Sequence, residues 1–238
     1  MARLLAPFLA ASLLAAAPAA AEPDARSERR GPAPRVERPD PRRLARLAHE
    51  RRIVWRASRS LGTPQAGALV DGVRLPPEGV HFTTWNPVTW RSPNAPARRF
   101  GSDRLVRTLL DAVARYAAAN PEAPRVVVGD LSRPHGGPFD ARYGIVGEFG
   151  PGRGTLGHVS HQNGLDVDVY YPRLDRRERA PDRLEEVDRA LAQALVDAFA
   201  RARPEFVFVG PRVGLRGPRA IVQALVRHDD HLHVRLRP

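Results

Sequence analysis

Two segments of this 238-residue chain carry ionisable side chains at every second position of an apolar run. The first is LDVDVY (165–170), and the second is HLHVRL (231–236). Successive side chains of a β-strand point to opposite faces, so the two aspartates share one face and the first two histidines share another. Each segment therefore predicts a strand with one face packed on an apolar core and one face that carries ionisable groups.

The aspartates of the first segment need a compensating partner. A buried carboxylate without one costs several kcal/mol or gives up its charge. Five of the eight histidines fall in the two clusters GHVSHQNGLDVD and RHDDHLHVRL, so imidazoles are available beside Asp166 and Asp168. Salt bridges to the abundant arginines are the alternative form of compensation.

If the two strands are neighbours, two imidazoles and one carboxylate converge, and His161 can complete the set from the loop before the first strand. Two His and one Asp around an open position form the ligand set of a catalytic zinc. The chain has no cysteine, which excludes thiolate ligands. Spacing alone leaves open which two of the three downstream histidines, His228, His231 and His233, bind the metal.

The remaining segments predict an α+β fold. Strands and helices do not alternate as regular βαβ units, which favours one antiparallel-leaning sheet with helices packed against it. Helical spacing begins after Ser102, a good N-cap, and stops at Asn120-Pro121. Further helices are predicted over 44–55, 184–202 and 218–228, further strands over 125–130 and 205–210, and a long Gly- and Pro-rich loop over 131–157.

The first 43 residues are unlike the rest of the chain. Residues 1–21 have a positive start, an apolar stretch and a small-residue cleavage site, as in a secretory signal peptide. Residues 22–43 are rich in Pro, Arg and acids, which predicts a disordered linker. We therefore predict one folded domain, which carries the zinc site, over 44–238 in a periplasmic or secreted protein that is not inserted in the membrane after signal cleavage.

The net charge of +12 does not indicate a nucleic-acid partner. Residues 22–60 hold 12 Arg against 6 acidic residues, so half of the excess charge lies in the predicted linker and just after it. The chain has no recognisable nucleic-acid recognition element, and an exported protein does not meet DNA. We expect no nucleic-acid partner.

The segments SHQNGLDVDVYYP and HDDHLHVRL resemble the two signatures of the penicillin-insensitive murein endopeptidases. These belong to the lysostaphin, D-Ala-D-Ala metallopeptidase and hedgehog-like group, whose pattern is H-x6-D followed by H-x-H. The similarity extends upstream through LGTPQAGAL and VVVGDLSRPHGG, over about residues 60–236. It implies that the domain over 44–238 is a zinc metallopeptidase, which hydrolyses peptide cross-links of peptidoglycan, notably the D-alanyl to diaminopimelate bond.

The resemblance also implies roles for individual residues. Zinc would be held by His161, Asp168 and His233, while His231 would be an unligated catalytic residue. Further active-site positions, for substrate or for orienting a ligand, would be His158, His228 and Asp166.

Two other functions fit the same residues. A zinc D,D-carboxypeptidase or dipeptidase would use identical site chemistry on the end of a wall peptide. A non-catalytic wall-binding module would keep the fold, although loss of His231 or of a metal ligand would then be expected, and neither is lost.

Overall fold

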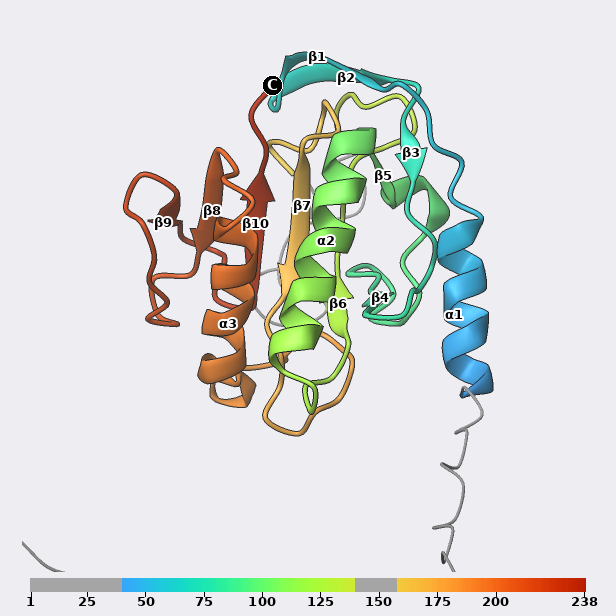
Figure 1. Ribbon diagram of the computed structural model, residues 1–238. Helices are drawn as coiled ribbons and strands as arrows, with labels where there is room; N and C mark the ends of the chain where they lie inside the picture. Colours follow the sequence, from blue (N-terminus) through green and yellow to red (C-terminus); the bar gives the residue numbers. More distant parts are fainter. Residues whose placement is uncertain (1–39, 140–157) are drawn as a thin grey trace, which may run out of the picture. The chain divides into compact units, whose positions relative to one another are not determined.

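The centre of the fold is a six-stranded sheet in which the two predicted strands lie side by side (Figure 1). The computed structural model describes residues 40–139 and 158–238, which belong to one unit, Pro39–Pro238. In order across the sheet, the strands are β4 Phe82–Thr84, β6 Val126–Val128, β7 Asp166–Tyr170, β10 His231–Arg235, β8 Phe206–Val209 and β9 Val222–Ala224.

The predicted α+β class is confirmed, but the sheet is mixed. The three inner pairs, β6–β7, β7–β10 and β10–β8, are antiparallel, whereas the outer pairs β4–β6 and β8–β9 are parallel. Parallel strands need a long crossover. The connection from β4 to β6 contains the helix α2, Asp103–Ala119, and the connection from β8 to β9 spans residues 210–221.

Two helices, α2 and α3, cover one face of the sheet (Figure 1). Ser102 caps α2 by accepting a hydrogen bond from Leu105 N at 3.1 Å, and Asn120 follows its last residue, as predicted. The second helix, α3, spans Arg189–Ala200 and starts at an Asp188 cap. Apolar side chains of both helices pack against one set of alternate strand residues, which are Val126, Val128, Val167, Val169, Val207, Val209, Leu232 and Val234.

Smaller elements flank this body. The helix α1, Pro41–Arg51, begins inside the stretch 22–43 that we predicted as linker, and Trp55 lies beyond its end. Two short antiparallel pairs follow, β1 Arg59–Thr63 with β2 Ala66–Val70, and β3 Val73–Arg74 with β5 Phe100–Gly101. Among the described residues, the remaining elements are two 3₁₀ turns, η1 Pro96–Arg98 and η3 Leu184–Glu186.

The prediction of a helix over 218–228 is wrong. Residues 222–224 form the edge strand β9, because Val207 N bonds Ile221 O and Leu225 N bonds Val209 O, each at 2.8 Å. These bonds satisfy the backbone of β8 on its otherwise open side, and this tertiary requirement overrides a composition that favours a helix. The helix predicted over 184–202 is shorter than expected, since its first turn is the separate η3.

The signal peptide and nearly all of the linker lie outside the described residues, as does the stretch 140–157 of the predicted long loop. The predictions for these segments stay predictions. Among the described residues, no helix is both long and apolar enough to span a membrane.

Candidate metal centre

The register between β7 and β10 brings the two predicted clusters together. His233 lies opposite Asp168, and His231 lies opposite Tyr170. Because side chains alternate along a strand, these ionisable groups occupy the sheet face opposite α2 and α3, while Leu232 and its alternate neighbours enter the core. The prediction that each segment is a strand with one ionisable face is confirmed, and the condition that the two strands are neighbours is met.

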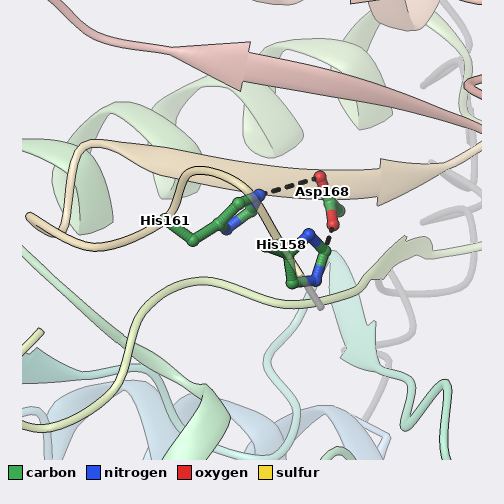
Figure 2. A group of neighbouring side chains, drawn as sticks. All are labelled: His158, His161 and Asp168. Atoms are coloured by element: carbon green, nitrogen blue, oxygen red, sulfur yellow. Dashed lines mark ion pairs between the residues drawn. The ribbon is translucent and has the colours of Figure 1, made fainter. Parts of the chain in front are cut away.

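Asp168 is the centre of the cluster. Its Oδ1 atom lies 3.3 Å from His161 Nε2, 3.3 Å from His233 Nδ1 and 3.7 Å from His231 Nε2. Figure 2 shows His158 and His161 approaching the same carboxylate from the loop that precedes β7. One acidic side chain thus faces imidazole nitrogens from two parts of the chain, the loop before β7 and the strand β10.

Each of these rings is held by its other nitrogen. His161 Nδ1 donates to the Leu131 carbonyl at 2.6 Å, and His233 Nε2 donates to Asp166 Oδ1 at 2.7 Å. His231 Nδ1 donates to Asp230 Oδ1 at 2.6 Å. Carbonyl and carboxylate oxygens only accept, so these contacts fix which nitrogen of each of these three rings points outward. They leave the second nitrogen of His161, His233 and His231 turned toward Asp168.

His161 reaches the cluster through an unusual backbone conformation. Its φ is 68°, in the left-handed region that non-glycine residues seldom adopt and that is often found at functional sites. The neighbouring residue is tied down on both sides, because Gln162 N bonds Pro64 O at 3.0 Å and Gln162 O accepts from Gly137 N at 2.9 Å. Contacts with the turn that joins β1 to β2 and with Gly137 therefore hold this conformation in place.

Two unpartnered acceptor atoms in this cluster fit a bound metal ion. His161 Nε2 and Asp168 Oδ1 are buried atoms that face each other and have no hydrogen-bond partner. Burial lowers the pKa of His161, and this effect is larger than the increase that Asp168 causes. A cation bound between a neutral imidazole lone pair and a carboxylate oxygen would satisfy both acceptors.

The charges around the cluster lead to the same conclusion. Arg98 pairs with Asp130, and Arg235 pairs with Asp166 at 2.7 Å. Among the described residues, the buried carboxylates of Asp168 and Asp230 are paired only with histidines. Two negative charges are thus left to histidine protons or to a divalent cation.

Acidic neighbours raise the pKa of two of these histidines. Burial lowers the pKa of His233, but Asp166 and Asp168 raise it to about 9. Burial likewise lowers the pKa of His231, while Asp230 and Asp168 raise it above its ordinary value. A metal ion would displace such a proton from the nitrogen that faces Asp168.

Two sets of three ligands share His161 and Asp168. In the first, the ligand atoms of His158, His161 and Asp168 all lie within 4.8 Å of one another. The second set, with His233 in place of His158, is the one that the family resemblance implied. His158 Nε2 lies 3.6 Å from Asp168 Oδ2 but only 2.8 Å from Asp130 Oδ2.

His228 borders the cluster without touching its centre. Its ring centroid lies 4.7 Å from that of His231, and its Nδ1 bonds Val226 O at 2.9 Å. Burial, together with His231 and His233, lowers the pKa of His228 to about 3. This ring is therefore neutral over the range in which most enzymes work.

Sequence reasoning did not identify Asp130 as a site residue, and it gave Asp230 no specific role. Asp130 comes two residues after a buried strand, next to Gly129, and this position was the signal available in the sequence. Asp230 precedes His231, but nothing in the sequence distinguishes it from Asp229. Asp229 instead accepts from Arg212 N at 3.0 Å, away from the ring of His231.

A scan of family models matches residues 60–203 to the model of the penicillin-insensitive murein endopeptidases, which is more than half of the chain. The chain belongs to this family. The match confirms the resemblance seen in the sequence motifs. A murein endopeptidase acts on peptidoglycan. The match ends before His231 and His233, and it is the pairing of β10 with β7 that adds these residues to the site. No curated protein matches the chain.

Proposed function

We propose that this murein endopeptidase is a zinc enzyme that hydrolyses the peptide cross-links of peptidoglycan, notably D-alanyl to diaminopimelate bonds. The observation that carries the proposal is the buried, unpartnered pair of acceptors, His161 Nε2 and Asp168 Oδ1. The family supports peptidoglycan as the substrate. The bond type comes from the resemblance of the sequence motifs.

Zinc is the proposed metal because two imidazoles and one carboxylate, without thiolates, form the ligand set of many catalytic zinc sites. His161, Asp168 and His233 would hold the ion, and Asp166 would orient His233 through the 2.7 Å contact with its outer nitrogen. When bound, zinc supplies a Lewis acid that polarises a carbonyl group and makes a water molecule more acidic.

His231 is the residue that we propose to move a proton. Asp230 holds its Nδ1, which leaves Nε2 on the side of Asp168. From that position Nε2 can accept a proton from the attacking water or donate to the developing oxyanion. His158 and His228 border the same space, and we propose that they contact the substrate.

The same proposal includes the location of the enzyme. Residues 1–21 would direct export and be removed, so that the enzyme works in the periplasm or outside the cell, where its wall substrate lies. Its partners would be peptidoglycan peptides. Neither nucleic acid nor stable membrane insertion belongs to this function.

The test is digestion of purified peptidoglycan by zinc-loaded and by chelated protein, with identification of the new peptide ends by mass spectrometry. A zinc endopeptidase converts cross-linked dimers to monomers only when loaded. Removal of the terminal residue from free pentapeptides, with dimers left intact, would instead show a carboxypeptidase. Binding to the wall without any new peptide end would show a wall-binding module.

A further inference from the structure

Asp130 is a buried carboxylate beside the metal centre that the proposed chemistry does not use. It comes two residues after β6, and its backbone continues the pairing of β6 with β7. Gly129 N donates to Asp168 O at 2.8 Å, and Asp168 N donates to Asp130 O at 2.9 Å. The sheet therefore fixes Asp130 directly against the central aspartate of the site.

Two side chains from residues 94–98 hold its carboxylate in the ionised form. Arg98 binds both oxygens through its guanidinium group, with Nε 2.8 Å from Oδ1, and Asn94 Nδ2 donates to Oδ1 at 2.9 Å. Burial by itself raises the pKa of Asp130, but Arg98 and His158 together hold it well below its ordinary range. Asp130 is 1% exposed, so its carboxylate is shielded from bulk solvent.

The outer oxygen of Asp130 determines the state of His158. Oδ2 lies 2.8 Å from His158 Nε2, and an ionised carboxylate can only accept, so Nε2 carries the hydrogen. A nitrogen that carries a hydrogen has no lone pair for a metal, although the same atom lies only 3.6 Å from Asp168 Oδ2. The ring is tilted against His161 at a centroid distance of 4.2 Å and packs edge-on with Phe139 at 4.9 Å.

The opposite ring nitrogen is then free to act. No described residue hydrogen bonds to His158 Nδ1, and the side chain is 23% exposed, whereas His161 is fully buried. A neutral ring with a hydrogen on Nε2 has its lone pair on Nδ1. His158 thus has a fixed donor side toward the protein and an acceptor for a ligand.

We propose that Asp130 is a positioning residue that acts through His158. It keeps His158 out of the metal coordination sphere and makes Nδ1 an acceptor for an N–H group of the peptide substrate or for the attacking water. The arrangement also selects between the two ligand sets of the site, because it leaves His161, Asp168 and His233 as the ligands. The catalytic part of this inference rests on the proposed function.

The first test is spectroscopic and needs no substrate. Nitrogen-15 NMR of the histidine rings, on zinc-loaded and zinc-free protein at pH 8, shows which nitrogen of His158 carries hydrogen. The His158→Ala spectrum assigns the signals. We expect hydrogen on Nε2 alone in both samples. Hydrogen on Nδ1 alone, hydrogen on both nitrogens, or a metal-bound Nε2 would each overturn the proposal.

The second test is a double-mutant cycle on peptidoglycan hydrolysis. Asp130→Asn should lower kcat about 10–100-fold, the usual effect of losing a residue that orients an active-site histidine, with bound zinc unchanged. In the His158→Ala background the same substitution should have an effect of no more than about twofold, because coupled residues are not additive. Full additivity in the cycle, or loss of zinc from Asp130→Asn, would contradict a role through His158.

A matched control separates positioning from general stability. Asp175→Asn also removes a carboxylate bound to an arginine, since Asp175 Oδ1 accepts from Arg173 Nε at 2.8 Å, but it lies outside the cluster. This variant should leave kcat and the His158 signals unchanged. If the wild-type enzyme hydrolyses no peptidoglycan, the proposed function fails, and the NMR result alone still decides whether Asp130 positions His158.

Discussion

At the scale of single residues, the site depends on hydrogen bonds that set which nitrogen of each ring faces inward. His161 relies on a backbone carbonyl, whereas His233 relies on Asp166. A carbonyl cannot be removed by substitution, but an aspartate can. Asp166 and Asp168 are therefore a matched pair of buried carboxylates on one strand face with different predicted effects.

Asp168→Ala should abolish zinc retention, because it removes the carboxylate that all of the facing nitrogens share. Asp166→Ala should weaken zinc affinity only about 10–100-fold, as expected of a residue that orients a ligand. Elemental analysis and competition with a chelator measure both effects. Asp175→Ala, outside the cluster, is the control. Equal zinc affinity of the Asp166 and Asp168 variants would contradict the assignment.

His231 and His233 share a strand face but should differ in role. His233→Ala should lose both zinc and turnover. His231→Ala should keep zinc and lose about 10²–10⁴ in rate, the contribution of proton transfer or oxyanion stabilisation. Zinc stoichiometry and peptidoglycan hydrolysis are measured on the same preparations. If His231→Ala loses the metal and His233→Ala retains it, the two roles are reversed.

The sequence revealed those site residues that a repeating pattern connects. Period two placed His231 with His233 and Asp166 with Asp168, and the structure pairs these strands. It could not reveal Asp130 as a neighbour of His158, or Arg98 as a neighbour of Asp130, because these contacts cross 28 and 32 positions and arise from turns without a periodic signal.

At the scale of elements, β10 serves the core and the site at once. Its register with β7 places Leu232 opposite Val169 on the helix side and His233 opposite Asp168 on the site side. A shift of one residue would exchange the two faces. The packing of Leu232 against the helices therefore helps to keep both histidines directed at the candidate metal centre.

Leu232→Ala should lower the free energy of unfolding by about 2–5 kcal/mol, because Leu232 is fully buried and the loss of its side chain leaves a cavity. Leu225→Ala is the control, since Leu225 is 38% exposed and follows the edge strand β9. Urea unfolding of the zinc-loaded proteins measures both. A loss smaller than 1 kcal/mol for Leu232→Ala would show that the register does not depend on this packing.

Helix α2 was predictable and strand β9 was not, for physical reasons. The pattern from Leu105 to Tyr116 agrees with both the cap at Ser102 and the buried face of α2. By contrast, residues 218–228 have the composition of a helix, and only the unsatisfied edge of β8 makes residues 222–224 a strand. That edge is created by chain folding, so local sequence does not contain it.

At the scale of the whole molecule, the predicted export signal determines where the enzyme meets its substrate. Protein recovered from the native host should begin near Glu22, because the small residues before it form the predicted cleavage site. Mass spectrometry of the mature protein measures this end directly. Recovery of a protein that still starts at Met1, or of one embedded in the membrane, would contradict a cleaved signal.

Shortening the chain should be tolerated up to the start of α1 and not beyond its end. A variant that starts at Pro39 keeps the Asp40 cap, the contact of Glu50 Oε1 with Val80 N at 2.8 Å, and buried Ile53. It should hydrolyse peptidoglycan and unfold as the mature protein does.

A variant that starts at Ser58 loses this charged hydrogen bond and the isoleucine packing, which together are worth about 2–5 kcal/mol. Thermal unfolding and hydrolysis are compared across the three lengths. If the Pro39 variant loses activity while it keeps its stability, the residues before it take part in catalysis or substrate binding, and the predicted linker has a direct function.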